Sequence, residues 1–181
     1  MDLTQRRLPH IHAAGQPLFV TFRLHGSLPS SRHFSSETLT SGHAFVHFDR
    51  LLERQSAGPL YLQMPDIARL VAASILAGAE RDYILHAWVV MPNHVHLLVT
   101  PLTNVSALMR RLKGSTARRA HLRLCLAGRP FWQHESYDRL VRDSVEFRQI
   151  ENYIVQNPVR AGLAVSAELY RWSSAWAGEA G

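Results

Sequence analysis

The chain has 181 residues, 46% of them hydrophobic, and is long enough to bury one substantial core. Its formal charge of +6 favours an anionic partner such as nucleic acid. The alternative is that the positive charge only keeps the protein in solution. The single cysteine, Cys125, excludes an internal disulfide, no apolar run approaches the roughly 20 residues of a membrane helix, and Met1–His12 lacks an apolar signal core. We therefore expect one cytoplasmic domain over residues 1–181 with no membrane partner.

Strands and helices are mixed along the chain, which predicts an α+β fold with an antiparallel sheet covered by helices. The first half is expected to hold a strand at Leu18–Leu24, a loop at Gly26–Gly42, a helix within His43–Arg54, a helix at Asp66–Ala79 after Pro65, a strand at Tyr83–Met91, a turn at Pro92-Asn93 and a returning strand at His94–Thr100. The second half is expected to hold a helix at Val105–Leu126, a break at Gly128–Pro130, a helix from about Ser144 to Gln156 with a stop near Gly162, and a packed tail at 172–181.

Two histidines two residues apart, His94 and His96, interrupt an apolar run that reads as a strand. Residues i and i+2 of a strand point to the same face, so two imidazoles would project side by side. A buried polar group without a partner costs about 1–3 kcal/mol, and a shared divalent metal satisfies both rings at once. This pattern predicts a metal site on the strand.

Other histidine pairs carry less weight. His10-Ile11-His12 lies in a polar segment before the first strand and reads as a loop, so we expect residues 1–16 to form an N-terminal DNA-contacting segment. His43 and His47 lie four residues apart on the expected helix, but no other metal-ligand side chain converges there.

A helical segment from Glu151 to Gln156 offers a tyrosine, Tyr153, with the amides Gln156 and Asn157 three and four residues further on. This spacing places the three side chains on neighbouring positions of one helix face, where an amide oxygen could complete a metal site. A core role is the ordinary reading of a lone helical tyrosine. The rival tyrosine is Tyr137, which precedes Arg139 and Arg142 and suits a structural or DNA-contacting role.

Basic residues gather on the expected helix at Val105–Leu126. Such clusters are often solvated surfaces, but phosphates would relieve their mutual repulsion and make binding sensitive to salt. The candidate DNA-binding residues are Arg110, Arg111, Lys113, Arg118, Arg119, Arg139 and Arg142.

The run from His86 to Val99 resembles the metal motif of the single-tyrosine HUH transposases. Phe131-Trp132-Gln133, Tyr153-Ile154 and Asn157–Leu163 resemble the branch of REP-associated tyrosine transposases, as do several shorter segments: Leu8-Pro9-His10, Phe19–Leu24, Leu28-Pro29 and Trp172–Ala175. The resemblance covers nearly the whole chain, and its two central motifs are specific in combination.

This resemblance implies a ferredoxin-like antiparallel sheet flanked by helices and a transposase that acts on hairpin-forming single-stranded DNA. It implies that Tyr153 cleaves and rejoins DNA through a 5′-phosphotyrosine, with Mg²⁺ or Mn²⁺ held by His94, His96 and Asn157. Transposases outside this branch carry glutamine as the third ligand, which keeps Gln156 as the alternative. Some relatives are homodimers and others monomers, and a nucleoid-associated cytoplasmic location follows from the substrate.

Helix phase alone hardly separates the two amides, because Asn157 is offset from Tyr153 by about 40° and Gln156 by about 60°. Pro158 disfavours α geometry at Asn157, so we expect the helix to loosen there and turn this side chain inward. Two other functions stay open: a domesticated, sequence-specific DNA-binding protein without transposition activity, and a metal-dependent phosphoesterase. A covalent protein–DNA adduct distinguishes the transposase from both.

Overall fold

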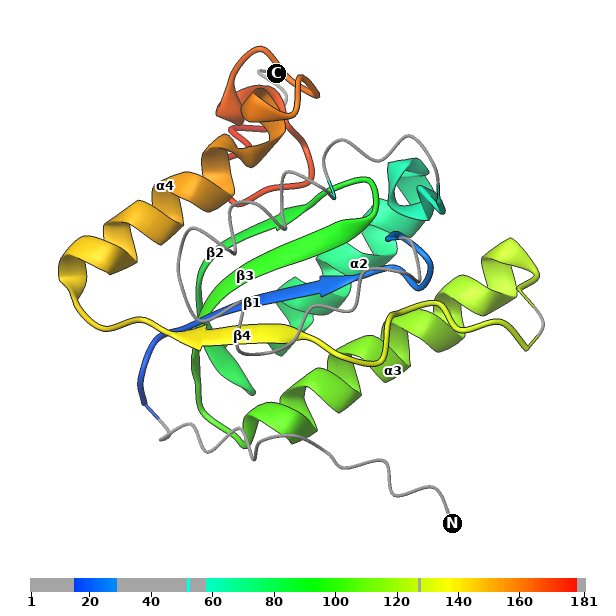
Figure 1. Ribbon diagram of the computed structural model, residues 1–181, viewed down its shortest axis with the longest axis horizontal. Helices are drawn as coiled ribbons and strands as arrows, with labels where there is room; N and C mark the ends of the chain where they lie inside the picture. The colour runs from blue at the N-terminus through cyan, green and yellow to red at the C-terminus, as the bar shows by residue number, and fades with distance from the viewer. Residues whose placement is uncertain (1–14, 29–51, 53–57, 127, 179–181) are drawn as a thin grey trace.

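The computed structural model describes residues 15–28, 52, 58–126 and 128–178 (Figure 1). The expected helix within His43–Arg54 lies outside these ranges except for Leu52, and so do the histidine pairs His10/His12 and His43/His47.

Four strands form one antiparallel sheet in the order β2-β3-β1-β4. The strands are β1 (Leu18–Arg23), β2 (Tyr83–Val90), β3 (His94–Pro101) and β4 (Tyr137–Leu140). The hairpin of β2 and β3 turns at Pro92-Asn93, as predicted. In the pairing of β1 with β3, Thr21 faces His96 and Arg23 faces His94. The sheet therefore brings β1 directly beside the two histidines.

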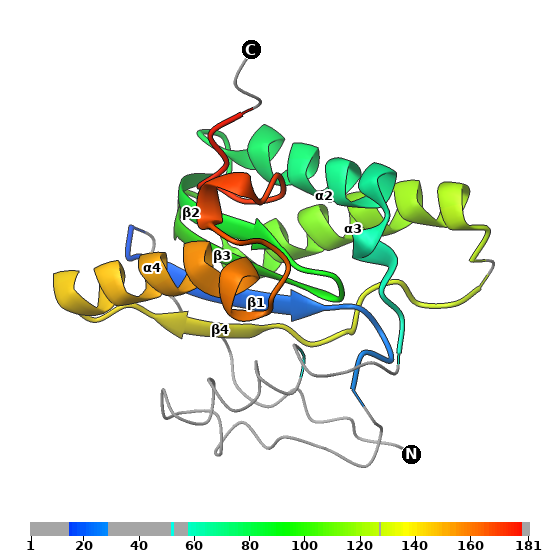
Figure 2. The same cartoon turned by 90° about the horizontal axis from the view of Figure 1, so that it is seen from above.

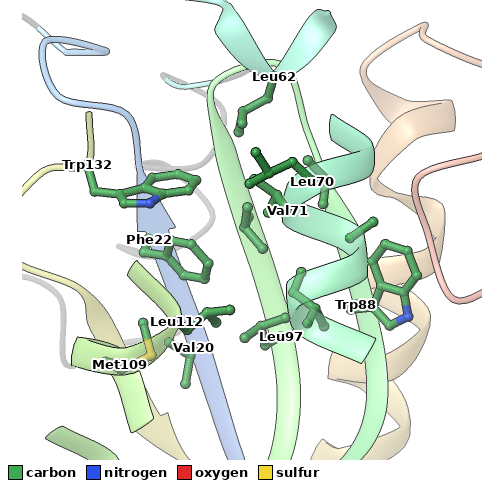
Figure 3. Packing of buried hydrophobic residues seen from close by; sticks show 14 of the residues in the cluster. Val20, Phe22, Leu62, Leu70, Val71, Trp88, Leu97, Met109, Leu112 and Trp132 are labelled. Atoms are coloured by element: carbon green, nitrogen blue, oxygen red, sulfur yellow. The ribbon is translucent and has the colours of Figure 1, made fainter. Parts of the chain in front are cut away.

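The larger core lies between one face of the sheet and two helices, α2 (Pro65–Gly78) and α3 (Val105–Leu124). Figure 2 shows both helices along this face. The core is built from apolar side chains of both layers and is shown in Figure 3: Val20, Phe22, Leu97, Leu70, Val71, Met109, Leu112 and Trp132. Burial of each large apolar side chain contributes about 1.5–3 kcal/mol, so this face anchors the sheet.

Helix α4 (Ser144–Arg160) packs against β2 and β3 on the opposite face, around a smaller cluster that includes Phe19, Leu98 and Ile154. Asp143 starts the helix, because its carboxylate accepts hydrogen bonds from the backbone N–H groups of Val145 (2.9 Å) and Glu146 (2.8 Å). The face that carries His94 and His96 is thus the face that α4 covers.

The last helix starts where the sequence predicts but ends later. It begins at Ser144, as predicted, but the expected end at Gln156 is wrong, because the helix continues through Pro158 to Arg160. The expected loosening at Asn157 is also wrong. Pro158 is buried, and the backbone carbonyls of Asn157 and Pro158 accept hydrogen bonds from Ala161 and Leu163, so burial and these bonds offset the cost of an internal proline.

The tail beyond Tyr170 packs on the domain, as predicted for its described part, residues 172–178. The backbone N–H of Val90 donates to the Trp172 carbonyl (2.8 Å), and that of Ser174 donates to the Trp88 carbonyl (2.9 Å). These bonds cover the outer edge of β2 with chain from the same molecule.

Strand β4 is absent from the sequence-based prediction. Its four residues are all partly exposed and do not alternate between apolar and polar, because a short edge strand is held mainly by its neighbour. Across the described ranges, none of the helices combines the length and the apolar character required to cross a bilayer.

Candidate metal and nucleophile site

The two histidines of β3 lie side by side beneath α4. Both residues are completely buried, and their ring centroids are 4.7 Å apart. The Nε2 atoms of His94 and His96 lie 3.1 Å from each other. As the sequence predicts, the period of two along a strand places both imidazoles on one face.

Each imidazole is held by a side-chain oxygen at its Nδ1 atom. The Asn93 amide donates from Nδ2 to the Leu52 carbonyl (3.0 Å), which directs its Oδ1 to Nδ1 of His94 at 2.7 Å. Since Oδ1 only accepts, neutral His94 carries its proton on Nδ1 and turns the lone pair of Nε2 toward His96. Nδ1 of His96 lies 2.7 Å from Oγ1 of Thr21, a hydroxyl that can donate or accept. His96 can therefore use either tautomer without losing this bond.

Tyr153 of α4 lies beside this pair. The centroid of its ring is 5.9 Å from that of His96. Phe19 of β1 is stacked on His96 at 5.6 Å and meets Tyr153 edge-on at 6.4 Å. The guanidinium carbon of Arg160, two turns further along α4, lies 4.5 Å from the centre of the tyrosine ring. The phenol is thus placed by neighbours from three elements, next to the buried imidazoles.

Helix α4 also decides which amide faces the sheet. Tyr153 and Ala161 lie four residues before and four after Asn157, so the three share one helix face. Tyr153 contacts His96, and Ala161 lines a pocket together with His94. Asn157 is completely buried between them, whereas Gln156 is partly exposed. The regular helix, rather than a loosened end, turns Asn157 inward.

A surface pocket reaches His94 from solvent. It lies where the β2–β3 turn meets the end of α4 and the segment before α2, and its lining includes Leu60, Gln63, Met91, Pro92, Asn93, Ala161 and Leu163. The pocket opens next to the histidine pair, while the His94 side chain itself is completely buried.

The donor set fits a divalent metal. Two ligand atoms about 2.1 Å from one ion lie about 3.0 Å apart when they subtend a right angle, close to the observed Nε2–Nε2 distance of 3.1 Å. Among the residues that the structure describes, no three or more His, Cys, Asp or Glu side chains form a metal-binding group. Asn157, the buried amide on the facing helix, is a candidate for a further oxygen ligand among the described residues.

The predicted basic helix lies on the other side of the sheet from the histidines, because α3 packs with α2 against the larger core. Several of the predicted DNA-contacting residues bind the protein itself. The Arg111 guanidinium donates to Asp82 (2.7 Å). Arg142 pairs with Glu146 at 3.2 Å, and Arg139 pairs with the same carboxylate. DNA contact by these residues stays a prediction.

Lys113 is the clearest case of a basic side chain with an internal role. Its Nζ donates to the carbonyls of Gln133 (2.7 Å) and His134 (2.8 Å) and to Oγ of Ser136 (3.2 Å). Burial lowers the pKa of this lysine to about 8. Lys113 therefore ties the segment that leads into β4 to α3. The predicted residues Arg110, Arg118 and Arg119 are exposed on α3.

The rival tyrosine also faces the α4 side of the sheet. Tyr137 of β4 pairs with Thr21, in line with His96 across the sheet, and meets Phe19 edge-on at 6.4 Å. Burial raises the pKa of Tyr137, which disfavours its phenolate. Its ring contacts Phe19 but, unlike Tyr153, it does not lie on the helix that carries the amide.

Sequence reasoning missed the residues that orient the imidazoles. Two features of the sequence could have pointed to these residues: Thr21 is the one hydroxyl in an apolar strand, and Asn93 directly precedes His94. Their roles depend on strand register and on a contact with Leu52, 41 residues away. Nothing in the sequence indicates that Phe19 and Arg160 contact the Tyr153 ring, because both contacts arise from the packing of the folded chain.

An antiparallel sheet with paired imidazoles on a central strand, covered by a helix that presents a tyrosine, is the arrangement implied by the resemblance to the single-tyrosine HUH transposases. The family model described as "Transposase IS200 like" matches residues 68–157, about half of the chain, a range that includes His94, His96, Tyr153 and Asn157. The chain belongs to this family. Among curated proteins, none matches it at a significant level.

Two solved structures are similar to the chain. The structure of a REP-associated tyrosine transposase bound to a REP hairpin is 19% identical, covers 92% of this chain and 80% of that chain, and has a TM-score of 0.60. This likeness confirms the expected fold, an antiparallel sheet flanked by helices. A protein from Deinococcus radiodurans R1 that carries a provisional transposase name is 17% identical, with coverage of 83% and 97% and a TM-score of 0.38.

Proposed function

We propose that this chain cleaves and rejoins single-stranded DNA through a covalent bond to Tyr153. The observation that carries the proposal is the position of the Tyr153 ring against His96, whose Nε2 lies 3.1 Å from that of His94. These contacts support the proposal because they bring the candidate nucleophile next to the candidate metal-binding pair within one chain. Membership of the IS200-like transposases supports DNA as the substrate.

We propose Mg²⁺ or Mn²⁺ as the cofactor, with His94, His96 and Asn157 as its protein ligands. When bound, the ion would polarise the scissile phosphate and offset its charge. The chain prepares the site by burying all three side chains and by orienting both imidazoles through Asn93 and Thr21. Such outer partners commonly set the basicity and direction of metal-binding histidines.

The chain supplies the nucleophile and its position. Oη of Tyr153 attacks the phosphorus, a bond from Oη to phosphorus forms, and the bond from phosphorus to the 3′ oxygen breaks, which releases a 3′-OH and leaves a 5′-phosphotyrosine. The phenol gives up its proton in this step and the leaving 3′ oxygen takes one up, so the step is balanced. Arg160, over the tyrosine ring, is placed to attract the phosphate. Attack by a 3′-OH reverses the step and rejoins DNA without ATP.

We propose a single strand that folds into a hairpin as the substrate. The solved relative with the similar fold is bound to a REP hairpin, and the +6 charge of this chain suits backbone contacts. The four proposed residues, His94, His96, Tyr153 and Asn157, lie together in one chain, so a monomer is compatible with the proposal. A homodimer and a nucleoid-associated cytoplasmic location stay predictions.

The test is incubation of the full chain with 5′- and 3′-end-labelled hairpin strands and Mn²⁺, followed by a denaturing gel. We expect a covalent adduct that carries the 5′ end of the downstream fragment, and a free 3′-OH fragment. Cleavage without an adduct would indicate the phosphoesterase. Binding without cleavage would indicate the domesticated DNA-binding protein.

The third ligand can be tested by metal titration. We expect Asn157→Ala to raise the Mn²⁺ concentration needed for half-maximal cleavage by roughly 5- to 150-fold, the equivalent of a lost polar contact of about 1–3 kcal/mol. Gln156→Ala is the matched control, because its side chain is partly exposed on the adjacent helix position, and it should change little. A shifted metal requirement in the Gln156 variant alone would reverse the assignment.

A second prediction concerns Thr21. When both Nε2 atoms bind a metal, His96 must carry its proton on Nδ1 and donate it to Oγ1 of Thr21. Thr21→Val keeps the shape of the side chain but leaves this buried N–H without an acceptor, so metal affinity should fall by roughly 10- to 100-fold. Thr21→Ser retains the hydroxyl and should retain affinity. Isothermal titration with Mn²⁺ measures both, and equal affinity in the valine variant would refute the orienting role.

A further inference from the structure

A second pocket opens beside the one that reaches His94. It is lined by His25, Pro59, Tyr61, Leu126, Arg129 and Pro130. The two pockets share the short segment before α2: Leu60 and Gln63 line the histidine pocket, whereas Pro59 and Tyr61 line the second one. One stretch of chain therefore separates two openings at the same end of the sheet.

The fold holds this pocket close to the metal and nucleophile site. The backbone N–H of His25 donates to the Phe131 carbonyl (2.9 Å), and that of Leu24 donates to the Asn93 carbonyl (2.8 Å). His25 follows Arg23 by two residues, and Arg23 pairs with His94. From strand spacings, the backbone of His25 lies roughly 8 Å from that of His94. At about 3.4 Å per stacked nucleotide, this distance is a reach of roughly two nucleotides.

The walls of the pocket are flat and apolar. The Tyr61 ring is stacked on Phe131, with ring centroids 6.2 Å apart and an angle of 17° between the planes. Phe131 is buried and is itself packed edge-on against Trp132 at 4.7 Å. This support fixes the orientation of Tyr61. An aromatic ring held in this way is a stacking platform, since every nucleobase presents a π-face.

The rim of the pocket is basic. His25 and Arg129 are both exposed, and none of the described residues of the lining is acidic. A purely apolar ligand would gain nothing from an arginine at the entrance. A base with its own phosphate uses both features, because the ring enters the apolar space and the phosphate stays at the rim.

We propose that this second pocket binds one unpaired base of the DNA strand, with Tyr61 as the stacking surface and Arg129 at the adjacent phosphate. The proposal rests on the proposed function for its substrate class. It adds a specific reason why the substrate is single-stranded at this point. A base in a duplex is stacked and paired, so it cannot enter a side pocket without being extruded.

The pocket can be located directly by photo-crosslinking. The probe is a 20-nucleotide strand of 5-iododeoxyuridine, bound to the full chain carrying Tyr153→Phe and irradiated in the long ultraviolet. We expect mass spectrometry to place a crosslink on Tyr61 or His25. Crosslinks confined to residues outside this pocket, for example to Trp176, would overturn the proposal.

Affinity measurements give a second, independent readout. The strands are a 20-mer of deoxythymidine and a base-free 20-mer with the same number of phosphates. We expect the Tyr153→Phe protein to prefer the strand with bases by at least about fivefold, the lower limit for one stacked base. Tyr61→Leu should remove this preference and Tyr61→Phe should keep it. An unchanged preference in Tyr61→Leu, with an unchanged melting temperature, would overturn the proposal.

Arg129 has a matched control in Arg69, which is exposed on α2 and makes a surface contact of 3.9 Å with Asp66. Arg129→Ala should weaken binding of both strands several-fold more than Arg69→Ala, and equal effects would exclude Arg129 from the pocket. Neither readout requires cleavage. Failure of the adduct assay with an intact base preference would refute the proposed chemistry alone, whereas adduct formation without a base preference would refute the pocket alone.

Discussion

Replacement of Tyr153 by phenylalanine is expected to abolish the covalent protein–DNA adduct, with a loss of cleavage of at least about a thousandfold. The substitution removes only Oη, and the ring can keep its contacts with Phe19, His96 and Arg160. Affinity for a single-stranded hairpin should therefore stay within about twofold of the native value. A denaturing gel measures the adduct, and fluorescence anisotropy measures binding on the same preparation.

Tyr137→Phe is the matched control for this experiment. Tyr137 lies on the same side of the sheet and also contacts Phe19, but burial raises the pKa of its phenol and so disfavours the nucleophilic form. We expect the Tyr137 variant to form the adduct. The reverse pattern, with the adduct lost in the Tyr137 variant and retained in the Tyr153 variant, would show that β4 rather than α4 supplies the nucleophile.

Removal of either buried imidazole should have the second large effect. We expect His94→Ala and His96→Ala each to eliminate metal-dependent cleavage and to reduce Mn²⁺ binding, measured by calorimetry, below detection. Both changes remove a nitrogen from a pair whose Nε2 atoms lie 3.1 Å apart. Mn²⁺ binding is the decisive measurement, because a folding defect would lower cleavage without any role for a metal.

Two controls separate metal binding from stability. His94→Ala leaves Oδ1 of Asn93, a buried group, without its imidazole partner, so some loss of stability is expected and thermal melting should accompany each titration. His86→Ala removes a histidine of β2 that bonds to Thr100 and lies outside the pair, and it should leave Mn²⁺ binding unchanged. Native Mn²⁺ affinity in both alanine variants of the pair, or its loss in the His86 variant, would contradict the proposed ligands.

The sequence by itself determines where most elements begin and why. Pro65 starts α2, Asn104 caps α3 by accepting from the Ala107 N–H (3.1 Å), and Asp143 caps α4. The strand period of two is enough to place His94 and His96 on one face. These features are local: each depends on residues within a few positions of one another.

Other features depend on contacts between distant segments, and here sequence reasoning was incomplete or wrong. Strand β4 exists because β1 offers it a hydrogen-bonding edge, and its own four residues show no strand pattern. The last helix continues through Pro158, and this residue is buried. The local preference of a proline to end a helix takes no account of such burial. Burial against another element can outweigh a local preference.

The candidate site shows the same division. The sequence by itself determined the residue types: two imidazoles on a strand, and a tyrosine with two amides on a helix. Only the tertiary structure decided that α4 turns Asn157 rather than Gln156 inward, that Thr21 and Asn93 orient the histidines, and that basic α3 lies on the opposite face of the sheet. The physical reason is that periodicity places side chains within one element, whereas the packing of elements decides which side chains meet.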